Sequence, residues 1–98
     1  MTITKKQDGT TLEVALEGRL DGTTAFELEE AVRPGLAGVE ELILDFSSLE
    51  YISSAGLRIL LTLHKEMHGK GNMKVIHANE IVQEVFEVTG FDSILDIA

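Results

Sequence analysis

The chain has 98 residues, 44% of them apolar, which fits one compact domain over residues 1–98 and excludes wholesale disorder. Its 17 acidic and 8 basic side chains give a formal net charge of −9, so neither direct binding to nucleic-acid phosphates nor membrane insertion is expected. Cysteine is absent, which excludes disulfides and suits a reducing cytoplasm, and no apolar run reaches the roughly 20 residues that span a bilayer.

A β-hairpin is expected at the start of the chain. Residues 11–18 alternate apolar and other side chains, which is the period of a strand with one buried face. Asp8 and Gly9 form a turn signal just before this strand, so residues 2–6 are expected to supply the other, antiparallel arm.

A helix is expected after this hairpin. Thr24 and Glu27 match a capping box, in which a hydroxyl and a carboxylate each accept from a backbone N–H that has no helical partner. The Pro-Gly pair at residues 34–35 should end the helix just before it. Phe26 lies off the apolar stripe and is therefore expected to be exposed. The stripe consists of Ala25, Leu28, Ala31 and Val32.

Residues 41–46 and 53–68 are expected to form a central strand and a second helix, joined by a connection at 47–52. The strand residues are apolar almost without a break, which predicts a strand covered on both faces or nearly so. Basic side chains near residue 68 and the glycine after it favour the helix end there. The apolar stripe expected on this helix consists of Leu57, Leu60, Leu61 and His64, widened by Ile59 and Leu63.

The last third of the chain is expected to contain a strand, a helix and a short final strand. Residues 72–78 have strand character, Asn79 opens the helix, Gly90 ends it, and residues 91–97 supply the last strand. A hairpin followed by alternating strands and helices predicts a mixed α/β domain with parallel crossovers. The stripe on this third helix is expected at Val82, Val85, Phe86 and Thr89.

Two serines stand where the central strand leads into the second helix, which is where functional sites gather in α/β sheets. Either can act simply as an N-cap, whose oxygen accepts from a free helix N–H, and Gly56 can simply allow close packing. We expect Ser53 to be the cap, which leaves Ser54 in the first turn with its hydroxyl available.

No enzymatic site is expected. A nucleophile elbow needs a glycine two residues before the serine, and Ile52 stands there relative to Ser54. His64 and His68 lie far along the helix, and His77 has no evident carboxylate partner. Phosphate-cradling glycine loops and metal-ligand spacings are also missing from the sequence, so no cofactor and no metal are expected.

Three segments, in the same order, resemble elements of the STAS domains, which are named for sulfate transporters and anti-sigma factor antagonists. They are LDFSSLEYISSAGLRILL at residues 44–61, GRLDGTTA at 18–25 and VTGFDSIL at 88–95. The chain is most similar to the free-standing bacterial anti-sigma factor antagonists. The resemblance implies a STAS-like mixed sheet of four to five strands, starting with a β-hairpin and packed against helices.

The resemblance also implies a regulatory function. In the antagonist family, the anti-sigma factor is a serine kinase that phosphorylates the antagonist at the start of the second helix. The unphosphorylated antagonist binds this kinase and frees the sigma factor, and a phosphatase reactivates the modified form. The position that matches the phosphorylated residue is Ser54.

This chain departs from the family pattern Asp-Ser-Ser/Thr-Gly-Leu around that position. Ser53 replaces the aspartate and Ala55 replaces the second hydroxyl residue, whereas Gly56 and Leu57 match. The loss of the aspartate keeps an alternative open, a STAS scaffold or transport-accessory subunit of the lipid-transport or stressosome type that is not phosphorylated. For an antagonist, the resemblance implies contacts with the kinase at Asp21, Thr24, Ser53, Ser54 and Gly56.

Overall fold

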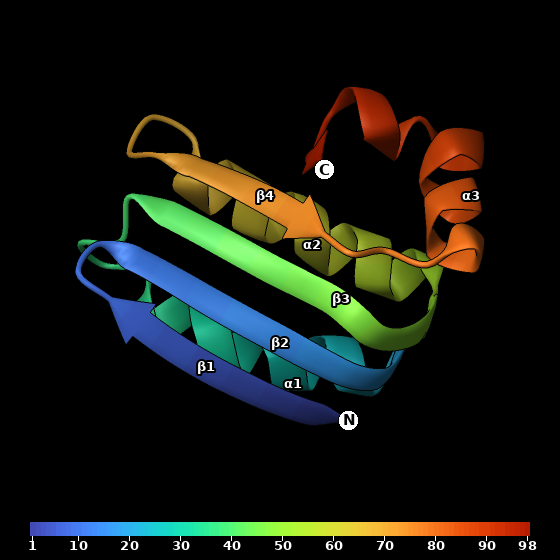
Figure 1. The fold of residues 1–98 in the computed structure, drawn as a ribbon, viewed down its shortest axis with the longest axis horizontal. Coiled ribbons are helices and arrows are strands. Elements are labelled where there is room, and N and C mark those ends of the chain that lie inside the picture. The colour runs from blue at the N-terminus through green and yellow to red at the C-terminus, as the bar shows by residue number, and fades with distance from the viewer.

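A mixed five-stranded sheet organises the chain, which a computed structural model describes from residue 1 to residue 98 (Figure 1). The strands lie in sequence order across the sheet; β1 and β2 pair antiparallel, and the remaining neighbours pair parallel. Gly9 makes the hairpin turn with a φ of +62°, as its place in the sequence predicts. The strands are β1 (Thr2–Asp8), β2 (Thr11–Leu20), β3 (Glu41–Ile52), β4 (Asn72–Ile76) and β5 (Asp96–Ile97).

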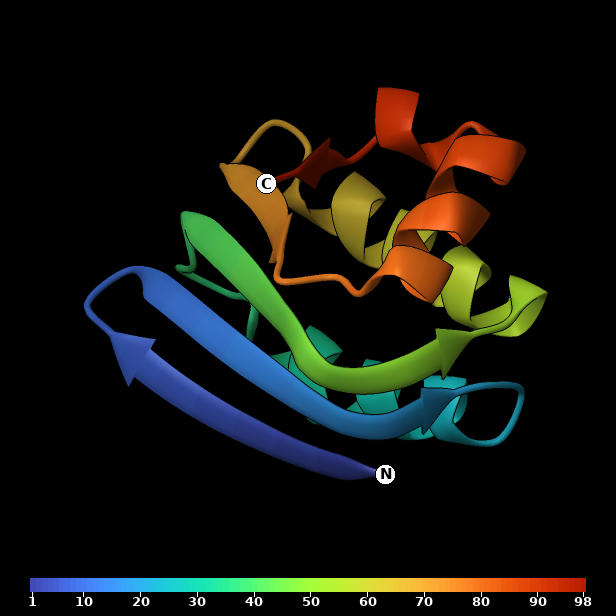
Figure 2. The ribbon, with the colours of Figure 1, turned by 45° about the vertical axis from the view of Figure 1, so that its right-hand side comes forward.

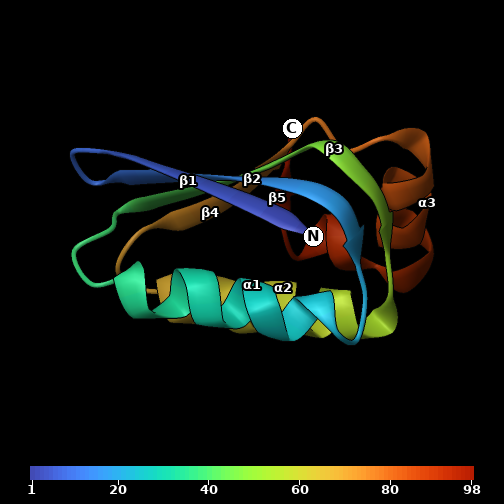
Figure 3. The same ribbon diagram turned by 90° about the horizontal axis from the view of Figure 1, so that it is seen from below.

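Three helices accompany the sheet, and two of them share one face. α1 (Thr24–Val32) and α2 (Ser54–Met67) lie side by side beneath the sheet in Figure 3, and both begin at the end where β2 and β3 finish. α3 (Glu80–Thr89) stands at that same end of the molecule (Figures 1 and 3). The expected α/β architecture with an initial hairpin is therefore confirmed.

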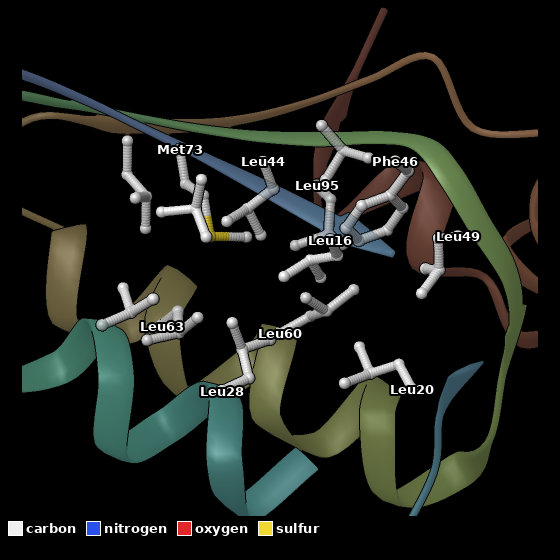
Figure 4. Packing of buried hydrophobic residues seen from close by; sticks show 14 of the residues in the cluster. Leu16, Leu20, Leu28, Leu44, Phe46, Leu49, Leu60, Leu63, Met73 and Leu95 are labelled. Atoms are coloured by element: carbon white, nitrogen blue, oxygen red, sulfur yellow. The ribbon is translucent and has the colours of Figure 1, made fainter. Parts of the chain in front are cut away.

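The core fills the space between the sheet and the pair α1 and α2. Leucines from β2 and β3 point down toward leucines from the two helices, and these inward-facing side chains are buried (Figure 4). Phe86 brings α3 into this core, with its ring stacked on Phe46 of β3 at 6.4 Å between centroids. This packing joins all three helices to the sheet in one buried cluster.

The expectation that β3 is covered on both faces is wrong. Leu42, Leu44 and Phe46 are buried, but Ile43 between them is only half-buried. No helix covers the second face of the sheet, as Figure 3 shows. Ile43 is apolar although it points away from the core, so the sequence of a strand buried on one face resembles that of a strand buried on both faces.

The expected connection at residues 47–52 is also wrong, because β3 continues to Ile52. Leu49 and Ile52 are buried and the residues between them are exposed, so the alternation of a strand is lost there. The cause is irregular pairing with β2, whose register shifts once after Ala15 and again after Gly18. The last part of β3 bends down toward the start of α2 (Figure 3).

The buried helix faces differ slightly from the expected stripes. On α2, Leu61 and His64 are half-buried on a flank, whereas Leu63 is fully buried. On α1 and α3, Ala31 and Val85 are half-buried and Thr89 is exposed. The helix ends agree with expectation, since Gly69 and Gly90 follow α2 and α3 with φ values of +86° and +79°. The residues that α2 buries are Gly56, Leu57, Leu60, Leu63 and Met67.

Candidate functional site

Ser53 and Ser54 take the two different positions that the sequence predicts. Ser53 is the N-cap of α2, in an extended conformation, and its Oγ accepts a hydrogen bond of 3.3 Å from the N–H of Gly56. Its own N–H donates to the carbonyl of Leu20 at 2.8 Å, which ties the cap to the end of β2. Ser54 follows in the first turn of α2 and is exposed. The Ser54 hydroxyl therefore does not cap the helix, because Ser53 makes that hydrogen bond.

The capping box at the start of α1 forms three residues earlier than the sequence predicts, between Asp21 and Thr24. Asp21 Oδ1 accepts from the N–H groups of Thr23 and Thr24, at 3.0 and 3.1 Å. In return, Thr24 Oγ1 accepts from the N–H of Asp21 at 2.8 Å and donates to the carbonyl of Arg19 at 2.6 Å. The expected pair of Thr24 and Glu27 is wrong, because an aspartate caps a helix as well as a threonine does and here stands earlier.

This capping fixes the charge of Asp21. The N–H groups of Thr24 and then Thr23, with a smaller contribution from the charge of Arg19, hold the pKa of the Asp21 carboxyl below its usual value. The carboxylate is therefore ionised at neutral pH, and it contributes a fixed negative charge at the start of α1.

The loops that start α1 and α2 lie side by side. Leu20 pairs with Ile52 in the parallel register of β2 and β3, so residues 21–24 and 53–56 leave adjacent strand ends (Figure 2). The five residues that the sequence singles out therefore come to one end of the molecule. Gly56, in contrast to Ser54, is buried, so we expect it to shape the loop rather than to touch a partner.

Gly56 allows the close approach of the two loops. A Cβ atom built there would lie 2.9 Å from the Leu20 carbonyl oxygen and 2.8 Å from Cγ1 of Ile52. Gly56→Ala should therefore lower the free energy of unfolding by about 1–2 kcal/mol, because overpacking of about 1–3 kcal/mol exceeds the helix-propensity gain of up to about 1 kcal/mol. Denaturant unfolding measures this difference.

The matched control for this substitution is Gly22→Ala. A Cβ atom at Gly22 would meet nothing within 4 Å, and its φ is not positive. We expect unchanged or slightly raised stability there. Equal stability of Gly56→Ala and the parent chain would show that the two loops are not packed as described.

Arg19 and Tyr51 form a feature of this end that sequence reasoning missed. The guanidinium carbon of Arg19 lies 4.8 Å from the centre of the Tyr51 ring, and both side chains are exposed. The two residues are partners in the register of β2 and β3. Their pairing follows two register shifts between β2 and β3, so it could be predicted only if both bulges were placed correctly.

Phe26 is exposed, as predicted, with 61% of its surface accessible. Arg33, which directly follows α1, donates a hydrogen bond of 2.8 Å from Nη2 to Glu66 of α2. Phe26 is the third residue of α1, so it lies at the end of the molecule where α2 also begins.

His77 has a carboxylate partner after all. Its Nδ1 lies 3.1 Å from Oδ1 of Asp45. Burial acts to raise the pKa of the Asp45 carboxyl, but the hydrogen bonds from the Ser47 N–H and from His77 outweigh burial and hold this pKa below its usual value. Asp45 belongs to the regular part of β3, before the bulges that lead to Ser53. Groups of three or more side chains able to hold a metal ion are absent, and none of the helices is long and apolar enough to cross a membrane.

Comparisons with known proteins converge on one family. A family model described as "Mlab, STAS domain" matches residues 3–96. BtrV of Bordetella bronchiseptica, a candidate anti-sigma factor antagonist, is 35% identical over 85 residues, which are 85% of this chain and 73% of BtrV.

Solved structures show the same fold. An anti-sigma factor antagonist from Mycobacterium paratuberculosis superposes with a TM-score of 0.88 at 24% identity, covering 98% of this chain and 83% of that one. SpoIIAA, an anti-sigma factor antagonist solved in its unphosphorylated form, gives a TM-score of 0.86 at 19% identity, covering 99% and 88% of the two chains. The Bacillus protein SpoIIAA in its phosphorylated form gives a TM-score of 0.76 at 18% identity, covering 99% and 91%.

Proposed function

Since the chain belongs to the STAS domain family, among its anti-sigma factor antagonists, we propose that it binds an anti-sigma factor serine kinase and is switched off by phosphorylation at Ser54. The observation that carries this proposal is the exposed hydroxyl of Ser54 in the first turn of α2, at the position that the family phosphorylates. The protein acts by binding, without catalysis of its own. It works in the cytoplasm, where a phosphatase returns it to the active form.

The start of α2 can carry a phosphate without refolding. Residue 54 follows the cap directly, so the N–H groups of Ser54 and Ala55 have no acceptor within the helix. The positive end of the helix dipole and these free N–H groups stabilise an added phosphate. Phosphorylation therefore changes the surface and leaves the fold as it is.

The same phosphate opposes binding to the kinase. It adds roughly −1.5 to −2 charges at a surface that already carries the ionised Asp21. A partner surface shaped for a neutral hydroxyl must then desolvate these charges, which costs several kcal/mol in an interface. Asp21 and Thr24 are the neighbouring contacts, and their side chains are rigid because they bond each other.

A second function rests on Ser53. The family pattern has an aspartate there, and in this chain the hydroxyl of Ser53 is engaged as the helix cap. The residue that would orient a kinase is thus replaced by a structural one. We therefore retain a STAS scaffold or transport-accessory subunit, which uses the same surface for a constitutive partner without phosphorylation.

Isolation of the native partner tests the two functions against each other. The tagged chain is recovered from its own cell with whatever it binds, and its phosphopeptides are mapped. Recovery of a serine kinase, with phosphate on Ser54 in part of the pool, supports the antagonist. Recovery of a transporter or of a scaffold complex, with no phosphate, supports the second function and contradicts the first.

Phe26 is expected to contribute to the kinase contact. Phe26→Ala should weaken kinase binding by about tenfold, as for an aromatic residue at the centre of an interface. The free energy of unfolding should change by no more than about 0.5 kcal/mol, because the ring is exposed. Calorimetric titration and denaturant unfolding measure the two quantities.

Ile94→Ala is the matched control for Phe26. Ile94 is also apolar and 46% exposed, but it lies near His64 and Met67, at the far end of α2 from Ser54. Its replacement should leave kinase binding unchanged. A large loss of stability in Phe26→Ala with intact binding would assign the ring to the core instead.

A further inference from the structure

α3 presents an apolar stripe to solvent that the proposed switch does not use. Ile81 and Val88 are 57% and 80% exposed, and the half-buried Val85 lies between them on the same side of the helix. Together with Glu84 and Thr89, these residues line a shallow hollow along α3. Large apolar side chains that gather at helical spacing on a surface mark an interaction site more often than scattered ones do.

Folding does not require Ile81 and Val88, the two exposed residues of this stripe. α3 is held to the body by its opposite side, where Val82 and Phe86 are buried and Phe86 stacks on Phe46. In Figure 3, α3 stands apart from α1 and α2, with its outer side free. Exchange of the outward residues for polar ones should therefore leave the fold intact.

The helix is also fixed firmly enough to present a rigid surface. Asn79 caps it by accepting from the N–H of Val82 at 2.8 Å, and its Nδ2 donates to the carbonyl of Leu49 in β3 at 3.0 Å. Gly90 closes the other end in a left-handed conformation. A preformed surface binds with less loss of conformational entropy than a flexible one.

The charges around the stripe decide which partner it fits. α3 carries Glu80, Glu84 and Glu87 and no basic residue, within a chain of net charge −9. These carboxylates repel an anionic membrane surface. They also disfavour a symmetric contact with a second copy, because such a contact sets each acidic rim against its own equivalent.

We propose that the outer face of α3, formed by Ile81, Val85 and Val88 with their acidic rim, binds the apolar face of a basic amphipathic helix in a partner protein. The aliphatic side chains take up the apolar residues of that helix, and the three glutamates meet its lysines or arginines. The residues that line this surface do not include Ser54 or its proposed neighbouring contacts, so we expect its occupancy not to depend on phosphorylation. The protein would thus have two binding faces, one switched and one constitutive.

A defined peptide pair tests this surface. The probe is a leucine-lysine peptide of roughly four helical turns with all its leucines on one face, and the control is a scrambled peptide of equal composition. NMR titration of the full chain should show shifts confined to α3 with the amphipathic peptide. The double variant Ile81→Gln/Val88→Gln should bind it about tenfold more weakly.

Two variants serve as controls. Phe26→Gln removes an exposed apolar residue from the equally acidic α1, and it should leave peptide binding unchanged. Ser54→Asp should also leave it unchanged, which separates this surface from the proposed switch. The proposal is overturned if the scrambled peptide binds as tightly, if α1 shifts as much as α3, or if the double variant binds normally. Self-association through α3, or adsorption of α3 to anionic vesicles, would also overturn it, because the surface would then bind a second copy of the chain or a membrane instead.

Discussion

Replacement of Leu60 by alanine should lower the free energy of unfolding by about 2–5 kcal/mol, the cost of a cavity in a core that cannot collapse. Leu60 has no exposed surface, and in Figure 4 its side chain lies between the sheet and α1. Neighbours on both layers are held by their own packing, so they cannot fill the space. Denaturant unfolding of the variant and the parent chain measures the loss.

Leu61→Ala is the matched control, because it removes the same atoms one residue further along α2. Leu61 is half-buried on the flank, so its replacement should cost clearly less than that of Leu60. Equal losses for the two variants, or an unchanged midpoint for Leu60→Ala, would show that the inward face of α2 is wrongly placed.

Substitutions at Ser54 should alter binding to the kinase and leave stability unchanged. Ser54→Ala should bind constitutively, whether or not ATP is present, because it cannot be phosphorylated. Ser54→Asp should bind at least about tenfold more weakly, since it introduces a charge into the contact. The aspartate carries one charge, so its effect should be smaller than that of phosphate itself.

Ser53→Ala separates the roles of the two serines. It removes the oxygen that accepts from the N–H of Gly56, so it should cost about 0.5–2 kcal/mol of stability, whereas Ser54→Ala should cost almost none. Thermal or denaturant unfolding of the two variants measures this contrast. If Ser54→Ala were instead the less stable variant, Ser54 would be the helix cap and Ser53 would carry the free hydroxyl. That result would remove the physical basis for choosing Ser54 as the phosphate acceptor.

Local signals were sufficient to predict the element order and several caps. Ser53, Asn79 and Gly90 act at helix ends, where one side chain or one left-handed residue satisfies backbone groups within a few residues. The hairpin turn at Gly9 has the same local character. The position of Ser54 followed from these features and from the resemblance to STAS domains together.

Features that depend on register or on distant contacts were not predictable. The bulges in the pairing of β2 with β3 hide the strand character of residues 47–52, and the same pairing sets Arg19 against Tyr51. Gly71 gives no local sign of its role, yet a Cβ atom there would collide with the carbonyl oxygen of Glu40. The bond between Asp45 and His77 likewise joins β3 to the residue that follows the neighbouring strand β4.

The prediction of the capping box of α1 failed for a different reason. Two overlapping frames, Asp21 with Thr24 and Thr24 with Glu27, both suit the start of a helix. The structure selects the earlier frame, in which the carbonyl of Asp21 also accepts from the N–H of Ala25 at 2.8 Å. Thr24 is thereby held at the first position of α1, where its hydroxyl supports Asp21.

Phosphate mapping on the isolated chain tests the switch most directly. The protein is incubated with its anti-sigma factor kinase and ATP, and the modified residue is located by mass spectrometry, with Ser54→Ala treated in parallel. We expect a single phosphate on Ser54 of the parent chain and none on the variant. Phosphate on Ser53, or no phosphate in the presence of a kinase that binds the chain, would contradict the assignment and favour the unphosphorylated scaffold.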